Sequence, residues 1–267
     1  MRKAVQSLSL VLFTLLFLLA TYRLPEWLPA DIYLRIDPLL GLTAVVASRE
    51  VIPRVLWALL LVGATLVIGR FFCAWLCPLG AAIDGLDGLL FRKVRRPGSK
   101  AEANLRTAKY VLLVLIVGAA LVGVSLAYFL DPIALLTRFY ALVLYPLAVA
   151  VANILLDFLR PLTGALGWVG LSHLRYPQPA FYMTGLTFLL FGGLIALGRW
   201  APRFWCRTLC PLGALLSLLS PLGLFKRRVS AECNRCGACQ KACPMGAIPA
   251  DPLATRNAEC IQCRTCA

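Results

Sequence analysis

Residues 70–81 read Arg-Phe-Phe-Cys-Ala-Trp-Leu-Cys-Pro-Leu-Gly-Ala, and residues 203–214 read Arg-Phe-Trp-Cys-Arg-Thr-Leu-Cys-Pro-Leu-Gly-Ala. Both stretches share the pattern R-F-[FW]-C-x3-C-P-L-G-A, which is too long a match to recur by chance. An Asp-Pro pair lies upstream of each copy, at Asp37-Pro38 and at Asp131-Pro132. The chain therefore contains one unit twice, and a parallel duplication of this kind predicts a two-fold axis along a membrane normal.

The composition of the chain is that of a membrane protein. Hydrophobic residues make up 60% of it, and its mean hydropathy is +0.81. A helix needs about 20 mainly apolar residues to cross a bilayer, and four stretches approach this: 5–22, 52–69, 109–128 and 181–198. We expect a mainly α fold, a polytopic helix bundle built from two repeated units. Because Leu19-Ala20-Thr21-Tyr22 is a poor cleavage site, we expect the first stretch to be an uncleaved anchor.

A fifth apolar segment, 139–159, lies in an insertion at 139–178 within the second copy. If the two C-x3-C-P motifs face the same side of the membrane, this insertion must cross it twice or not at all. Because Pro146, Asn153 and Asp157 are costly inside lipid, we expect 139–159 to be interfacial or re-entrant. The alternative is that it crosses and a segment near 161–174 returns.

The basic residues indicate orientation. The net charge is +15, and Lys and Arg gather at the N-terminus, between 92 and 109, and at 226–228. Such residues prefer the cytoplasmic side, so we place the N-terminus and the C-terminal segment in the cytoplasm of a multi-pass inner-membrane protein. The basic residues flank the spans, where they can contact membrane lipid; this argues against nucleic-acid binding.

The C-terminal segment has the cysteine spacing of a bacterial-type ferredoxin. It contains C-x2-C-x2-C-x3-C-P, followed by a second C-x2-C-x2-C run. In such motifs three cysteines of a run hold one [4Fe–4S] cluster, and the fourth reaches the other cluster. We therefore expect two clusters, the first on Cys233, Cys236 and Cys239, and the second on Cys243, Cys260, Cys263 and Cys266. The fourth ligand of the first cluster is expected about four residues beyond residue 267.

The C-x3-C-P cysteines have several possible roles. On a helix, residues four apart share one face, so Cys73 with Cys77, and Cys206 with Cys210, would each form a pair. Two pairs meeting at the axis would suit an additional soft metal or Fe–S centre. The alternatives are a redox-active dithiol and simple packing of small apolar residues.

Four residues near these motifs each have a structural interpretation and a functional one. Arg70 and Arg203 are expected to act as snorkelling anchors, although they could also lower the pKa of the thiols. Asp37 and Asp131 are expected to start turns, with quinol proton acceptance as the alternative.

Two C-x3-C-P-L-G-A motifs, Asp-Pro loops and a double ferredoxin motif resemble the NapH/NosR/CcoG-type membrane polyferredoxins of bacteria and archaea. The resemblance implies an oxidoreductase subunit, similar to a quinol dehydrogenase, that relays electrons between the quinone pool or a cytoplasmic donor and a partner reductase. It implies quinone and redox proteins as partners. The alternatives are a copper or iron reductase, a metallocofactor assembly factor, and a redox sensor or transporter.

The motifs divide the chain into four parts. These are a first membrane repeat, a basic cytoplasmic loop, a second membrane repeat containing the insertion, and an α+β ferredoxin domain: residues 1–90, 91–108, 109–228 and 229–267.

Overall fold

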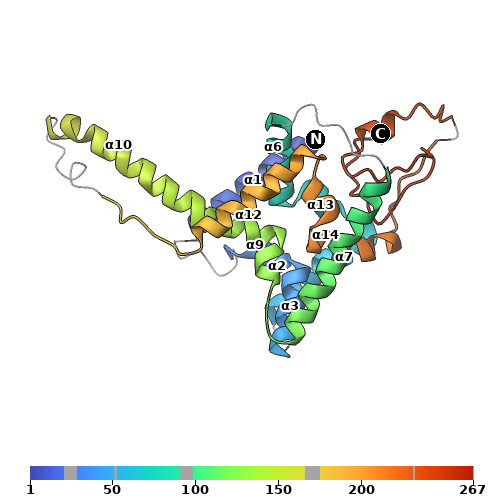
Figure 1. Cartoon of the computed structure of the whole chain (residues 1–267), viewed down its shortest axis with the longest axis horizontal. Helices are drawn as coiled ribbons and strands as arrows, with labels where there is room; N and C mark the ends of the chain where they lie inside the picture. The colour runs from blue at the N-terminus through green and yellow to red at the C-terminus, as the bar shows by residue number, and fades with distance from the viewer. Residues whose placement is uncertain (21–28, 51–52, 91–98, 166–174, 231, 267) are drawn as a thin grey trace. The chain divides into compact units, whose positions relative to one another are not determined.

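A computed structural model of the chain describes residues 1–20, 29–50, 53–90, 99–165, 175–230 and 232–266. The basic residues at 92–96 and part of the insertion lie outside these ranges. The chain forms two compact units: the first comprises residues 1–135 and 194–267, and the second comprises 136–193. Both copies of the repeated motif belong to the first unit, which also contains the C-terminal cysteine segment (Figure 1).

The helices follow the duplication read from the sequence. Those up to residue 90 are α1 (Arg2–Leu19), α2 (Ile32–Ile36), α3 (Pro38–Ser48), η1 (Pro53–Val55), α4 (Leu56–Ile68), α5 (Phe71–Trp75) and α6 (Pro78–Leu90). Those of the second copy are α7 (Ser99–Leu121), α8 (Ala127–Leu130), α9 (Pro132–Phe139), α12 (Thr184–Ala196), η3 (Leu197–Arg199), α13 (Phe204–Thr208), α14 (Pro211–Leu219) and η4 (Ser220–Leu222). The insertion forms η2 (Tyr140–Leu144) and α10 (Tyr145–Ala165), and α15 (Ala238–Ala242) lies among the C-terminal cysteines.

Each Asp-Pro pair starts a helix rather than a simple loop. Proline suits the first helical position, and an aspartate before it can cap the free backbone N–H groups. Asp37 Oδ1 accepts hydrogen bonds from the backbone N–H groups of Leu39 and Leu40 at 2.8 and 3.3 Å. Asp131 Oδ2 accepts the equivalent bonds at the start of α9, at 2.9 and 3.1 Å.

Each C-x3-C-P motif is a break between two helices. The short helices α5 and α13 each end two residues before the second cysteine, and α6 and α14 begin at the proline. Cys210 has an extended backbone (ψ 112°), as a residue before proline prefers. Its Sγ accepts the N–H of Gly213 at 3.2 Å, and Cys77 Sγ accepts the N–H of Gly80 at 3.4 Å. The expectation of two thiols on one continuous helix was therefore wrong, because proline forces the second thiol into a capping position.

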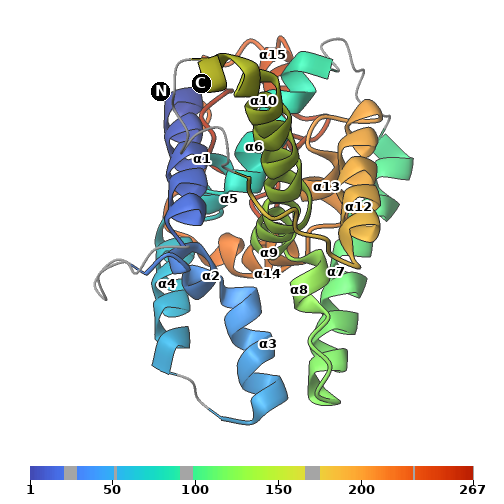
Figure 2. The ribbon, with the colours of Figure 1, turned by 90° about the vertical axis from the view of Figure 1, so that its left-hand side faces the viewer.

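The helices of the first unit pack around these breaks. α1 lies against α5 and α6 (Figure 2), whereas α7 lies against α3, α13 and α14. The core between them is apolar and close-packed, with fully buried side chains that include Leu39, Leu79, Ile116 and Leu212. Removing such side chains from solvent stabilises the unit by about 1.5–3 kcal/mol each.

A buried arginine joins the two copies. The guanidinium of Arg203 donates to both carboxylate oxygens of Asp84 at 2.6 and 2.7 Å, and to the carbonyl of Cys73 at 2.9 Å. Only 1% of Arg203 is exposed, and Arg70 is fully buried. Neither side chain reaches outward to an interface, so the snorkelling role expected for them was wrong. A guanidinium has five donors in a rigid fork, which lets one side chain bind acid and backbone groups together.

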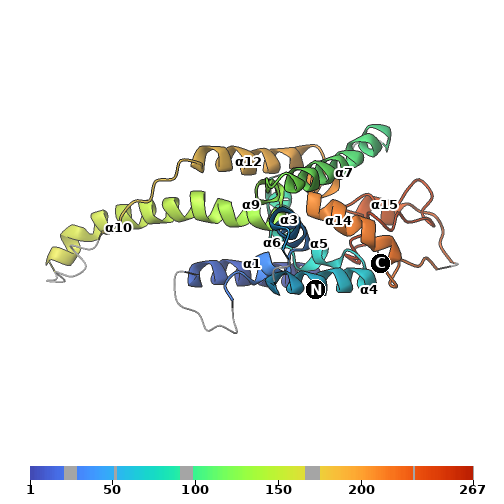
Figure 3. The same ribbon diagram turned by 90° about the horizontal axis from the view of Figure 1, so that it is seen from below.

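The second unit is built on a long helix. α9, η2 and α10 follow one another without a break. The π-helical turn η2 ends two residues before Pro146, whose ring cannot fit a regular helical turn. The chain then returns past α10 towards α12 (Figure 3), and the side-chain amide of Asn153 exchanges two hydrogen bonds with the backbone of Tyr176, at 2.9 and 3.0 Å. Asp157 pairs with Arg160 at 3.1 Å. The polar residues expected to be costly in lipid therefore have partners.

Two helical stretches among the described residues are long and apolar enough to cross a bilayer. They are Arg2–Leu19 and Pro132–Pro161, while α4 and α12, at two other expected spans, are shorter. The insertion thus contains a helix of spanning length, where an interfacial or re-entrant segment was expected.

The C-terminal segment differs from the expected α+β domain. Within residues 224–230 and 232–266 the backbone forms one short helix, α15, and no β-strand. Turns dominate because much of this segment wraps around cysteine side chains instead of pairing with itself.

The ion pair between Arg203 and Asp84, which connects the two copies, predicts that the stability of the protein depends on pH. Burial alone would raise the pKa of the Asp84 carboxyl, but hydrogen bonds and charge from Arg203 outweigh burial and hold that pKa below its usual value. The stabilisation is therefore complete above the unfolded-state pKa, about 3.9, and is lost as the pH falls towards the folded-state value. We expect Asp84→Asn to cost about 3 kcal/mol at pH 7 and to flatten the acid limb of the thermal unfolding curve measured in detergent.

Asp31→Asn is the matched control, because Asp31 pairs with Arg35 at a partly exposed site (2.8 Å). Such a pair contributes at most about 0.5 kcal/mol. Equal destabilisation by the two substitutions would contradict the role given to Asp84.

Candidate functional site

The four C-x3-C-P thiols meet at one cavity in the first unit. Cys73, Cys77, Cys206 and Cys210 all line it, together with Pro132 from the start of α9. The side chains leave only about 10 Å3 between them, room for about one water molecule. The structure thus brings together the two pairs that the sequence suggested would meet at the axis.

Arg70 lines the same cavity and is completely buried. Its Nη1 donates to the carbonyl of Ala258 at 2.8 Å and lies 3.5 Å from Glu259 Oε2. Within the described residues its Nε and Nη2 have no hydrogen-bond partner. Buried donors without an acceptor are costly, so these N–H groups favour an anion, such as thiolate sulfur, in the cavity.

The glycine of each C-P-L-G-A motif makes room for this arrangement. A Cβ at Gly213 would lie 3.0 Å from Arg70 Nη2, and one at Gly80 would lie 3.1 Å from the carbonyl oxygen of Cys73. The structure therefore explains five positions of the repeated pattern: the arginine, the two cysteines, the proline and the glycine.

Glu259 is the acid partner of Arg70, and it comes from the C-terminal segment. Its carboxylate also contacts Lys109 Nζ at 2.5 Å and Arg106 Nη1 at 4.0 Å. Glu259 and Lys109 are both buried. Burying a charge is costly unless it is paired, so this carboxylate fixes the segment around Cys260 against Arg70. Sequence reasoning missed Glu259; its place directly before a ligand cysteine was the available clue.

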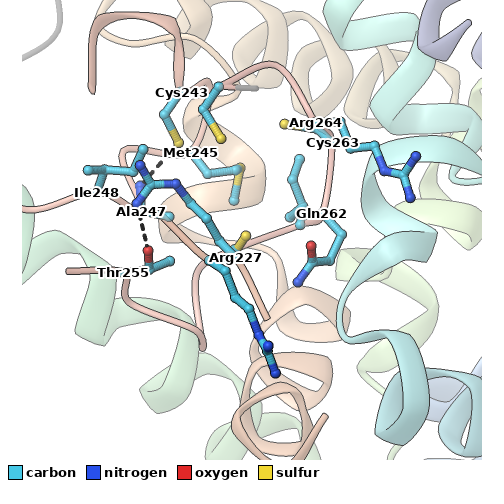
Figure 4. Close-up of a pocket in the computed structure, with 13 residues that line it drawn as sticks. Arg227, Cys243, Met245, Ala247, Ile248, Thr255, Gln262, Cys263 and Arg264 are labelled. Atoms are coloured by element: carbon cyan, nitrogen blue, oxygen red, sulfur yellow. Dashed lines mark hydrogen bonds between the residues drawn. The ribbon is translucent and has the colours of Figure 1, made fainter. Parts of the chain in front are cut away.

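Four C-terminal thiols share a second cavity, of about 200 Å3. Cys243, Cys260, Cys263 and Cys266 line it, which is the set expected to hold the second cluster. Figure 4 shows the sulfur atoms of Cys243 and Cys263 turned towards this space, with further sulfur atoms around it. Arg227 crosses the edge and donates to Thr255 Oγ1 at 3.0 Å. The N–H of Ala247 points at Cys243 Sγ, at 3.3 Å.

Two thiols of this cavity, Cys260 and Cys266, hold their protons more strongly than free thiols do. Burial raises the pKa of Cys260, and it also raises the pKa of Cys266, where the charge of Arg227 counteracts it. Metal binding must therefore release these protons, and it becomes more favourable as the pH rises.

The two C-terminal cysteine runs have the same backbone form. Arg235 and Gln262 occupy equivalent positions, just before the second cysteine, and both have positive φ values of 56° and 52°. Gly237 and Arg264, just after that cysteine, also match, with φ values of 73° and 55°. This conformation is uncommon for residues other than glycine, so a shared requirement imposes it, namely turning three thiols inward.

The first run lies nearer the surface. Cys233 and Cys239 are partly exposed, and Cys236 is exposed. In contrast, the second run is bound to the helices: Trp75 Nε1 donates to the carbonyl of Gln262 at 3.1 Å, and Ser220 Oγ donates to that of Asn257 at 3.0 Å.

The donor sets suit iron–sulfur clusters better than single ions. Among the described residues, no three Cys, His, Asp or Glu side chains are placed to hold one metal ion. A cluster separates its sulfur ligands more widely, because its own inorganic core lies between them. The four thiols around the 200 Å3 cavity, Cys243, Cys260, Cys263 and Cys266, fit such a group.

Comparison with known proteins agrees with this reading. A family model described as a 4Fe–4S binding domain matches residues 51–97 and 183–230, the two segments that contain the C-x3-C-P motifs. A second model with the same description matches residues 229–248. Ferredoxin-type proteins are among the relatives, including NapH of Haemophilus influenzae, which is 26% identical over 78% of this chain and 64% of its own length. The chain is similar to the NapH-type polyferredoxins.

Other relatives of the chain come from bacteria and archaea. YccM of Escherichia coli K12 is 33% identical over 76% of this chain and 49% of its own length. MJ0750 of Methanocaldococcus jannaschii is 27% identical over 76% and 69%. The chain thus spans between about half and about two thirds of these relatives. No solved structure matches it.

The close contacts around Gly80 and Gly213 give a direct test of how tightly the four-thiol site is packed. Gly80→Ala forces its new methyl group against a backbone carbonyl that cannot move aside, so we expect a loss of about 1–3 kcal/mol of stability and a lower iron content. Gly213→Ala should do the same by displacing Arg70. Both effects can be measured by thermal unfolding and iron analysis of purified protein.

Gly85→Ala, also on α6, is the control, because a Cβ there meets open space. It should be neutral or stabilise α6 by up to about 1 kcal/mol. Wild-type behaviour of all three variants would show that the surroundings of Gly80 and Gly213 are not tightly packed.

Proposed function

We propose that this protein is an integral membrane electron-transfer protein, which relays single electrons between the quinone pool or a cytoplasmic donor and a partner reductase. One observation carries the proposal. Arg70 contacts the Cys260 segment through Ala258 and Glu259, and its other N–H groups line the cavity of the four C-x3-C-P thiols. Two sulfur-rich sites are thus joined through one buried side chain.

The cysteines define three candidate cofactor sites. Cys243, Cys260, Cys263 and Cys266 would hold one [4Fe–4S] cluster; Cys233, Cys236 and Cys239 would supply three ligands of another. Cys73, Cys77, Cys206 and Cys210 are the candidate ligands of a third centre, because the family model covers them; their thiols would have to move apart to admit a cluster, since they enclose only about 10 Å3. When bound, such clusters supply one-electron redox chemistry at potentials set by charge, hydrogen bonds and solvent access.

The protein's own residues set the order of these sites. Cys236 is exposed, so the first run is the place where a redox partner protein can approach. The second run is fixed to the helices by Glu259 and Trp75, and the four-thiol site lies inside them. We propose this order, from surface to core, as the electron route.

Exposed apolar side chains support a membrane location. Large apolar residues of α1, α4 and α7 are exposed in the protein alone, among them Leu8, Val11, Leu60, Val114 and Leu115. A surface of this kind is unfavourable in water and marks a face that lipid or another protein covers. With the basic flanks described above, it supports a multi-pass protein of the bacterial or archaeal inner membrane.

An apolar cavity beside the four-thiol site suits quinone. It measures about 300 Å3 and is lined by α1, α2, α4 and α5, including Tyr33, Ile36, Ala64 and Phe72. Phe72 directly precedes Cys73, and Ile36 directly precedes Asp37. Binding sites for small apolar ligands have this size and lining. A quinone ring here would lie next to the helix that carries Cys73.

Removing the C-x3-C-P thiols tests the electron route. We expect the double substitution Cys73→Ser and Cys77→Ser to slow re-oxidation of the reduced ferredoxin clusters by a soluble quinone analogue by about tenfold or more, which needs only about 1.4 kcal/mol of added barrier. Stopped-flow spectroscopy of anaerobic protein measures the rate, and iron analysis counts the centres. Thr208→Ser, located between Cys206 and Cys210, is the control. An unchanged rate would remove these thiols from the route.

Filling the apolar cavity tests quinone binding. Ala64→Phe should raise the concentration of quinone analogue needed for half-maximal re-oxidation by about tenfold, the loss expected from roughly 1.4 kcal/mol of binding energy. Gly63→Phe is the control, because a side chain there meets open space on the same helix. Equal kinetics for the two variants would place the quinone elsewhere.

A further inference from the structure

We propose that Asp37 and Asp131 form a proton-binding site between the two repeats, which takes up one proton when an electron reaches the four-thiol site. The electron part of this inference rests on the proposed function. The proton site itself rests on the carboxyl groups alone.

The two carboxyl groups are equivalent by repeat and meet in the core. Each is 0% exposed and uses one oxygen to cap the first turn of its helix. The side chains of Asp37 and Asp131 lie within hydrogen-bonding reach of each other. Their remaining oxygens, Asp37 Oδ2 and Asp131 Oδ1, have no donor among the described residues.

This arrangement requires a proton. Two ionised carboxylates facing each other in a dry core repel strongly, and each leaves an oxygen without a donor. One shared proton removes one charge and supplies the missing hydrogen bond, as in the paired aspartates of aspartic proteases.

The groups that act on each carboxyl, among the described residues, are the other carboxyl and the backbone N–H groups at the start of its own helix. Three buried cations of the first unit bind other acids: Arg203 binds Asp84, and Glu259 binds Lys109 and Arg70.

The pair lies next to the site where charge would change. Pro132, which directly follows Asp131, lines the cavity of the four thiols, and α3 packs against α14, which Cys210 caps. An electron arriving there from the Cys260 side adds one negative charge to a dry core. Binding of one proton from water converts the carboxyl pair from singly to doubly protonated and cancels that charge. The reverse electron step releases the proton.

The first experiment tests the shared proton without redox chemistry. The infrared spectrum of the purified full-length protein at pH 7 should contain the C=O band of a buried protonated carboxyl, shifted in D2O. Asp37→Asn alone should abolish the whole band, because the new amide donates to Asp131, which then needs no proton. Asn also caps helices about as well as Asp. Asp131→Asn should do the same, and Asp31→Asn, at a partly exposed site, should change nothing.

Absence of the band in wild-type protein would overturn the proton site. Retention of half of it in a single variant would do so as well, because it would mean two independent protons.

The second experiment tests the coupling. The midpoint potential of the four-thiol site should fall as the pH rises, by about 59 mV for each tenfold drop in proton concentration if one proton accompanies one electron. In the double variant Asp37→Asn and Asp131→Asn the slope should vanish. An unchanged slope would overturn the coupling but leave the infrared result standing. Failure to find any redox centre at these thiols would overturn the proposed function and, with it, the coupling.

Discussion

The contact between Arg70 and Glu259 is the interaction on which the site depends. Arg70 is fully buried, and a buried guanidinium without a counter-ion would be strongly destabilising. Its counter-ion comes from the C-terminal segment, and its remaining N–H groups turn to the four-thiol cavity. The same side chain therefore satisfies its charge, fixes the Cys260 loop and provides a positive wall for sulfur ligands.

The two repeats supply the acid partner of their buried arginine from different places. In the first copy, Asp84 on α6 supplies the acid for Arg203. Ser217 stands at the equivalent place on α14, where its hydroxyl bonds Tyr110 at 2.8 Å instead. The second copy thus has no acid of its own at this place, and Arg70 takes Glu259 in its stead. The asymmetry gives the ferredoxin segment one defined place against an otherwise duplicated core.

Much of this could be predicted from the sequence. The duplication, the meeting of the two C-x3-C-P pairs and the grouping of Cys243 with Cys260, Cys263 and Cys266 follow from spacing, because spacing alone limits how thiols converge. The break at each C-x3-C-P motif was only half predicted: proline signals a helix end, but its capping cysteine depends on backbone geometry. The buried arginines could not be predicted, since a lone Arg near a helix end reads equally well as an anchor, and its acid partner is distant in sequence. The hydrogen bonds of Asn153 could not be predicted, because this residue finds its partner, Tyr176, only after the chain returns.

The origin of that counter-ion also bears on how the protein is made. Glu259 lies 189 positions after Arg70 along the chain, so the ribosome synthesises the helices that carry Arg70 and Lys109 long before the acid that neutralises these two cations. Until Glu259 is made, the growing chain holds an arginine and a lysine without their acid. These buried charges can therefore pair, and the core around them can close, only after the Cys260 loop has been synthesised.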